Sequence, residues 1–155
     1  MHKERNIKKS KTHRVFCVLC LLVCVNIFSQ TNIDSLKITQ LTTDDYETLS
    51  NVDINGHKAK VTKNYILIED GNIWNLKDKI KYLFTPTDVK RTNEIEFLNI
   101  DVYSETAVVI YRLKSIFDDN GKKTESNWSE SVVCKKTNGE WKLSLTHSTP
   151  IKEKY

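Results

Sequence analysis

Cysteine is scarce in this chain of 155 residues. Three of the four cysteines lie within the first 24 residues, so Cys134 is the only one in the remainder of the sequence. A single cysteine cannot form an internal disulfide, and a domain without disulfides depends on its hydrophobic core. We therefore expect packing rather than covalent cross-links to hold the domain together, with Cys134 as a buried, inert thiol.

Metal-binding patterns and repeats are also absent. The four histidines form no His-x-His or His-x-x-x-His pair, although closely spaced histidines and cysteines are typical of zinc sites. We therefore expect no metal and no cofactor. No internal repeat or low-complexity segment occurs, and the roughly 126 residues that follow the first 29 are enough for one domain of ordinary size.

The first 29 residues have the composition of a signal peptide. Residues 1–14 contain six basic side chains and one acidic side chain, and an unbroken apolar run of 11 residues follows from Val15 to Val25. A basic head, a short apolar stretch and a small residue are what a signal peptidase recognises, whereas a membrane span needs roughly 20 residues. We predict cleavage after Ser29 and an exported protein, periplasmic or secreted. An uncleaved membrane anchor is the alternative.

Removal of this segment changes the charge balance. The whole chain has 24 basic and 20 acidic residues, of which the first 29 residues contain six and one. The mature chain therefore has 18 basic and 19 acidic residues, a net charge near −1. Because a basic excess is what attracts nucleic acid and anionic membranes, we expect no nucleic acid partner and, after signal cleavage, no membrane partner.

The remaining sequence alternates between helical and strand patterns. One or two short helices are expected between residues 34 and 52, the second starting near Thr43, and another helix begins with Asn75 as its N-cap and ends before Pro86. Strands are expected over residues 61–69, 73–74, 94–103, 106–118, 123–136 and 140–149. The pattern predicts an α+β domain over residues 30–150, with an antiparallel sheet packed on N-terminal helices and a loose tail over 151–155.

Three turns set the expected pairing of the long strands. Asn-Gly at 120–121 and again at 138–139 suits a two-residue type I′ turn, because both central positions need positive φ. Ser-Glu at 104–105 is taken as a third two-residue turn. Since a two-residue turn fixes which residues face each other, one sheet face is predicted to be apolar. This face would carry Leu98, Ile100, Val102, Ala107, Val109, Tyr111, Leu113, Trp128, Val132, Cys134, Leu143 and Leu145.

One row on the predicted apolar face is polar. The register places Tyr111 opposite Glu130, and Glu130 opposite His147, while Leu98 lies opposite Tyr111 on the other side. A carboxylate on an apolar face is costly unless it is hydrogen-bonded, so Glu130 is expected to bond Tyr111 or His147. Three interpretations stay open: a buried network that holds the strands in register, a ligand pocket without chemistry, and a catalytic site.

The order of these elements resembles the nuclear transport factor 2-like superfamily. Residues 131–149, Ser-Val-Val-Cys-Lys-Lys-Thr-Asn-Gly-Glu-Trp-Lys-Leu-Ser-Leu-Thr-His-Ser-Thr, are similar to the end of its SnoaL-like and related uncharacterised branches, with a Gly-x-Trp-Lys turn and a late histidine. Residues 65–74, Tyr-Ile-Leu-Ile-Glu-Asp-Gly-Asn-Ile-Trp, resemble the first hairpin of the same branches. The resemblance implies a cone-shaped, strongly bent sheet wrapped around helices.

The resemblance also implies a site inside the cone. Enzymes of this superfamily, such as ketosteroid isomerases and polyketide cyclases, place a carboxylate there beside Tyr, His or another acid, so Glu130 or His147 would be the base and Tyr111 the donor of an isomerase, cyclase or dehydratase. The chain has no equivalent of the second buried acid of the isomerase pattern. We therefore expect an exported domain that binds a small, partly apolar ligand or a partner in the cone pocket without catalysis. The pocket candidates are Tyr111, Glu130, His147, Leu98 and Trp128.

Assembly is the third hypothesis, because many members of this superfamily dimerise through the outer sheet face. The homodimer interface would then include Ile95, Phe97, Val108 and Ile110.

Overall fold

Four long strands make up most of the sheet. The computed structural model describes residues 32–152, and the predicted signal peptide lies outside the described residues. The four strands are β3 (Lys90–Tyr103), β4 (Thr106–Asp119), β5 (Lys122–Thr137) and β6 (Glu140–Pro150). All three predicted two-residue turns are confirmed between them, and both Asn-Gly pairs have positive φ at both residues.

Two shorter strands complete a six-stranded sheet. β1 (Val61–Glu69) and β2 (Asn72–Asn75) pair as the predicted hairpin, and the strand order is β2-β1-β6-β5-β4-β3. β1 runs parallel to β6, so the sheet is mixed where the sequence indicated antiparallel pairing throughout. The parallel pair joins segments far apart in sequence, because the chain forms the four other strands between β1 and β6.

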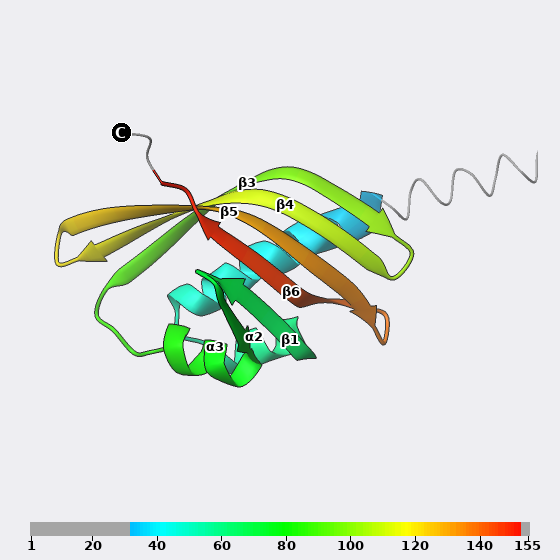
Figure 1. Ribbon diagram of the computed structural model, residues 1–155, viewed down its shortest axis with the longest axis horizontal. Helices are drawn as coiled ribbons and strands as arrows, with labels where there is room; N and C mark the ends of the chain where they lie inside the picture. The colour runs from blue at the N-terminus through cyan, green and yellow to red at the C-terminus, as the bar shows by residue number, and fades with distance from the viewer. Residues whose placement is uncertain (1–31, 153–155) are drawn as a thin grey trace, which may run out of the picture. The chain divides into compact units, whose positions relative to one another are not determined.

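Three helical segments pack on the sheet. Residues 32–50 form a helix that crosses one face of β3–β6 (Figure 1), and it is followed by α2 (Ile54–Lys60) and α3 (Leu76–Leu83). The expected break near Thr43 is wrong, because the hydroxyls of Thr39, Thr42 and Thr43 each donate to the carbonyl four residues earlier. These threonines therefore satisfy their side chains within a continuous helix instead of capping a new one.

The core lies between the helices and the inner face of the sheet. Asn75 caps α3 as predicted, since its side chain accepts a hydrogen bond from the backbone N–H of Asp78, and α3 ends before Pro86. All but one of the buried apolar side chains in the described residues form one cluster that joins the first helix to the strands, the exception being Phe84. Its members are Ile38, Val61, Tyr65, Leu67, Ala107, Val109, Tyr111, Leu113, Val132, Cys134, Trp141 and Leu143.

A bulge interrupts the pairing of β3 with β4. Ile100 faces Val109 as predicted, but Leu98 has no partner, and the ladder resumes with Phe97 opposite Tyr111. An extra residue in one strand shifts every following side chain to the opposite face. Leu98 is therefore 49% exposed rather than on the inner face, whereas Phe97 and Ile95, predicted for the outer face, pack against the core.

A second bulge interrupts the pairing of β5 with β6. Cys134 faces Leu143 as predicted, but Ser144 is skipped and Leu145 then pairs with Val133. The predicted contact between Glu130 and His147 is therefore wrong. Ser148 lies opposite Glu130, and His147 is exposed on the outer face.

The described residues from Ser35 onward form one compact unit. Within the described part of the chain, no helix has the length and apolar character needed to cross a membrane. Residues 151 and 152 have no regular secondary structure, and the rest of the predicted tail lies outside the described residues.

Candidate functional site

A cavity of about 550 Å³ opens between the helices and the inner sheet face. Its walls come from the 32–50 helix, α3, the connection after α3 and all strands except β2. Most of its lining is apolar or aromatic, and a smaller set of polar side chains is gathered among these residues. The lining residues are Thr42, Asp45, Tyr46, Leu49, Leu67, Glu69, Lys79, Tyr82, Leu83, Thr85, Pro86, Thr87, Arg91, Tyr111, Leu113, Phe117, Trp128, Glu130, Leu143, Thr146 and Ser148.

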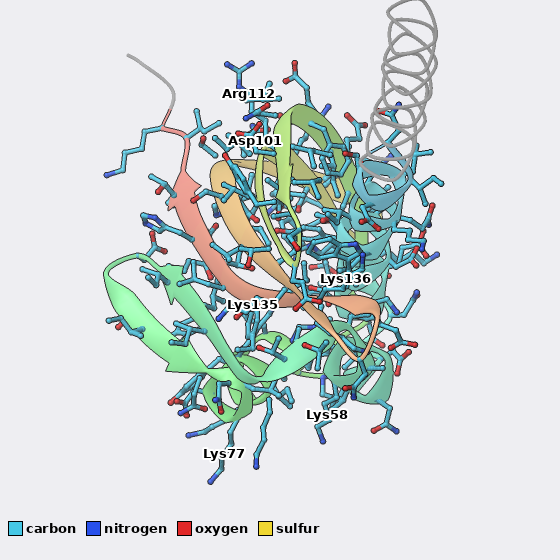
Figure 2. All side chains as sticks on the ribbon, turned by 90° about the vertical axis from the view of Figure 1, so that its right-hand side faces the viewer. Lys58, Lys77, Asp101, Arg112, Lys135 and Lys136 are labelled. Carbon is cyan, nitrogen blue, oxygen red and sulfur yellow. The ribbon has the colours of Figure 1, made fainter. Side chains whose placement is uncertain are left out.

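A second, shallower hollow of about 660 Å³ lies over β1 and α3. Its charged residues, Lys58, Lys63 and Lys77, are all exposed. Figure 2 shows Lys58 and Lys77 projecting away from the fold. Because solvent surrounds these charges, they would interact more weakly with a ligand than buried groups do.

Glu130 is the centre of a hydrogen-bonded group inside the cavity. Its side chain accepts from three hydroxyls: Tyr46 and Tyr111 both donate to Oε2, the latter over 2.7 Å, and Ser148 donates to Oε1 over 2.9 Å. The two phenol oxygens lie 3.3 Å apart. Glu130 is only 5% exposed. We call these four residues the Glu130 cluster.

Four different elements position the Glu130 cluster. Tyr111 on β4 faces Glu130 on β5, as the sequence predicts, and the second bulge brings Ser148 on β6 to its other side. Tyr46 comes from the 32–50 helix and was not predicted. It lies four residues after Thr42 and eight after Ile38, both buried, so helical periodicity is the signal that places it on the buried face.

Both phenols of the Glu130 cluster stay protonated at neutral pH. Burial raises the pKa of Tyr46 well above its usual value, and the negative charge of Glu130 raises it further. Burial likewise raises the pKa of Tyr111 well above its usual value, with contributions from Tyr46 and Glu130. Each phenol is therefore a hydrogen-bond donor to the carboxylate.

A second buried group, the Asp45 cluster, lies next to the same cavity. His57 Nδ1 lies 2.6 Å from Asp45 Oδ1, and Lys79 Nζ lies 3.7 Å from Asp45 Oδ2. Lys79 also donates to the Tyr65 hydroxyl over 3.0 Å, and Tyr65 donates to the Thr146 hydroxyl over 2.9 Å. All five side chains are buried, so this cluster contains an ion pair shielded from water.

The charges of the Asp45 cluster stabilise each other. Burial alone would raise the pKa of Asp45, but the positive charge of Lys79 and the hydrogen bond with His57 together lower it. Burial alone would lower the pKa of Lys79, but Tyr65 and Asp45 raise it. Sequence reasoning missed this pair, and the expectation of no second buried acid is wrong, because Asp45 lines the same cavity as Glu130. Lys79 falls on the apolar face of α3, three residues after Leu76, and that position is the signal that could have identified it.

Arg91, at the start of β3, supplies the second positive charge of the cavity. Its Nε donates to Asn93 Oδ1 over 2.9 Å, and its Nη2 donates to the buried Ser115 hydroxyl over 2.9 Å. The guanidinium carbon lies 5.9 Å from the ring centre of Tyr46 and 5.2 Å from that of Phe117. The guanidinium is thus held by two neutral acceptors and two aromatic rings.

The structure brings together three of the five predicted pocket residues. Tyr111, Glu130 and Trp128 line the cavity, whereas Leu98 lies on the first bulge and His147 on the outer face, and neither of these lines it. Burial raises the pKa of the Cys134 thiol to about 12, as expected for an unreactive cysteine. Among the described residues, no three His, Cys, Asp or Glu side chains are grouped as metal ligands.

Comparison with known proteins identifies the fold. No protein-family model and no curated protein matches the sequence. Among solved structures, a nuclear transport factor 2 (NTF2-like) superfamily protein from Salmonella enterica has a TM-score of 0.66 and 18% identity, over 77% of this chain and 92% of the other. The chain has the NTF2-like fold.

Two further NTF2-like neighbours differ in description. A putative Ca/calmodulin-dependent kinase II association domain from Exiguobacterium sibiricum has a TM-score of 0.67 and 14% identity, over 78% of this chain and 95% of the other. A ketosteroid isomerase-like protein from Erwinia carotovora has a TM-score of 0.63 and 14% identity, over 76% and 96%. At these identities the likeness shows the fold alone, so function has to be argued from this chain's own residues.

Proposed function

We propose that this protein binds a small, partly apolar molecule in the cavity without transforming it. The observation that carries the proposal is a cavity of about 550 Å³ whose lining combines apolar and aromatic side chains with polar groups, several of them fixed by hydrogen bonds. Small-molecule sites generally have roughly 300–1,000 Å³ and this composition. Leu67, Leu113 and Leu143 supply aliphatic surface, and Phe117 and Trp128 supply aromatic surface.

The hydrogen bonds of Glu130 favour binding over catalysis. An ionised carboxylate has about four acceptor positions, and three hydroxyls already donate to Glu130. A general base needs a free position directed at the proton that it removes, and the three hydroxyls leave Glu130 only about one. The two phenols, for their part, donate to the carboxylate rather than standing free for a substrate oxygen. The same residues that would make a SnoaL-like acid–base site thus satisfy each other.

A probe of binding needs a substitution that fills the cavity and a matched one that does not. Leu49 lines the cavity, while Leu36, on the same helix, is 72% exposed. We expect Leu49→Trp to weaken binding of the neutral fluorescent probe N-phenyl-1-naphthylamine at least tenfold, and Leu36→Trp to leave it unchanged. Thermal unfolding of both variants controls for folding. Equal binding by Leu49→Trp and the unsubstituted protein would contradict the proposal.

Self-association is a second candidate function, supported by apolar side chains on the outer sheet face. Ile66, Leu98 and Ile110 are exposed there, and the neighbours described as association domains are consistent with assembly. Of the interface residues predicted from sequence, Val108 and Ile110 remain on the outer face, while the first bulge turns Ile95 and Phe97 inward.

The oligomeric state tests this candidate. In light scattering coupled to size exclusion, a dimer that dissociates in Ile110→Lys but persists in Leu36→Lys would support assembly through the outer face. A monomer at all concentrations would exclude it.

Export remains part of the proposal on sequence grounds, through the basic head and apolar run of residues 1–29. N-terminal sequencing of protein recovered from outside the cytoplasm should begin near Gln30. Recovery of the full-length chain inside the cell would contradict it.

A further inference from the structure

We propose that the ligand of this cavity is a small amphipathic carboxylate, and that its acid group pairs with Arg91. The inference deepens the proposed binding function and rests on it. The apolar body of the ligand would occupy the aliphatic and aromatic walls, and the carboxylate would define its orientation.

Arg91 is held in place before any ligand arrives. Ser115, which accepts from the guanidinium, is fully buried and itself donates to Asn93 Oδ1 over 2.7 Å. The Asn93 amide in turn donates to the Ser50 hydroxyl over 2.8 Å and to the Tyr46 carbonyl over 3.3 Å. A guanidinium that is fixed in this way loses little conformational entropy on binding.

Neither hydrogen bond of Arg91 goes to a negative charge, and the charges of Glu130 and Glu69 act on it only at longer range. Asn93 and Ser115 are neutral acceptors, and they use two of the five N–H donors of a guanidinium. Among the described residues, no carboxylate oxygen lies within 4.0 Å of the Arg91 guanidinium nitrogens. Arg91 is half-buried, and a charge drawn from water is costly unless it is paired. A ligand carboxylate would supply a directly bonded counter-charge in bidentate geometry.

The other charged side chains of the cavity already have bonded partners, with one exception. Lys79 pairs with Asp45, and Glu130 accepts from three hydroxyls. The exception is the half-buried Glu69, whose pKa is raised by burial and by the charge of Glu130, while Lys79 and Arg91 partly oppose the rise. Because Glu69 opposes a second negative charge, a singly charged carboxylate fits better than a doubly charged phosphate.

The test compares two probes that differ by one charge, 1-naphthylacetate and 1-naphthylacetamide, by calorimetry at pH 7.5. We expect the unsubstituted protein to bind the acid about tenfold more tightly than the amide, because a hydrogen bond between charged partners is stronger than a neutral one. The ratio of the two affinities is the readout, since general damage to the cavity affects both probes alike.

Four substitutions assign the preference to Arg91. In Arg91→Gln the ratio should fall to about one, whereas Arg91→Lys should keep a reduced preference for the acid. Arg112→Gln is the matched control, because Arg112 is exposed and projects from the fold (Figure 2), and it should leave the ratio unchanged. Glu69→Gln should raise affinity for the acid and not for the amide, and this holds even if Arg91→Gln fails to fold.

The possible results distinguish the carboxylate inference from the proposed binding function. Equal binding of acid and amide to the unsubstituted protein would overturn the carboxylate inference and leave cavity binding intact. A preference that persists in folded Arg91→Gln, or one that Glu69→Gln does not increase, would overturn it as well. Failure of both naphthyl probes and of N-phenyl-1-naphthylamine would contradict the binding function itself.

Discussion

The Glu130 cluster and the Asp45 cluster each bury a carboxylate beside the same cavity, but they stabilise it differently. Asp45 is paired with a cation, Lys79, and with His57. Glu130 has no cation bonded to it among the described residues and is held by three neutral hydroxyls. The Asp45 cluster depends on a single partner of opposite charge. In the Glu130 cluster, three hydrogen-bond donors from three elements stabilise the carboxylate together.

This difference shows how each cluster contributes to the fold. Removing one partner of a buried ion pair leaves an uncompensated charge, which is among the most destabilising changes in a protein. Removing one hydroxyl of three leaves the carboxylate with two donors. The Asp45 cluster should therefore control stability, while the Glu130 cluster should tolerate single changes and mainly set the polarity of the cavity.

The largest expected effect is that of Lys79→Met. We expect a loss of about 3–5 kcal/mol in the free energy of unfolding, because Asp45 would remain buried without its cation. Urea denaturation measures this loss. Lys81→Met, on the exposed side of the same helix, is the matched control and should stay within about 0.5 kcal/mol. Similar values for the two variants would mean that the buried pair contributes little.

Acid should weaken the Asp45 cluster by a smaller amount. The pKa of Asp45 is lowered in the folded state from its ordinary value of 3.8, so its stabilising contribution is complete above that value and is lost as the pH falls through the folded pKa. Unfolding curves of the unsubstituted protein and of Asp45→Asn should therefore converge below about pH 4. A stability difference that stays constant down to the acid transition would argue against a charged Asp45.

The Glu130 cluster should show a weaker response. Tyr111→Phe removes one donor and is expected to cost about 1–2 kcal/mol, with Tyr46→Phe similar, because each leaves Glu130 partly satisfied. Combining the two substitutions should cost more than the sum of the single changes, since the carboxylate then retains only Ser148. Strict additivity in the double-mutant cycle would indicate that the phenols act independently.

The smallest effect is expected for His147→Ala. Because His147 is exposed on the outer face, its removal should change stability by less than about 0.5 kcal/mol. The register drawn from the turns alone would have made it a partner of Glu130 and predicted a much larger loss. A loss above about 2 kcal/mol would therefore show that β6 lacks its bulge.

The turns and the pairing of β4 with β5 could be predicted because they depend on local chemistry. Asn-Gly requires positive φ, and a two-residue loop then determines that Tyr111 faces Glu130. The bulges could not be predicted in this way, because Leu98 and Ser144 are ordinary strand residues whose extra position arises from the bending of the sheet.

The helical half of the site depends on contacts between distant segments. Tyr46 and Asp45 reach the cavity only because the 32–50 helix packs on the inner sheet face (Figure 1), and Lys79 does so from α3. Helical periodicity indicates that these positions are buried, but not which strand residues they meet. The parallel pairing of β1 with β6 has the same origin.

The skipped Ser144 has a consequence for how such a domain can change over generations. Loss of that one codon would remove the unpaired residue, because Leu143 and Leu145 already face the neighbouring residues Cys134 and Val133. The remaining residues of β6 would keep their present partners, with Ser148 opposite Glu130 and His147 outside. The bulge therefore gives β6 one spare position, and an in-frame deletion there would leave the Glu130 cluster intact.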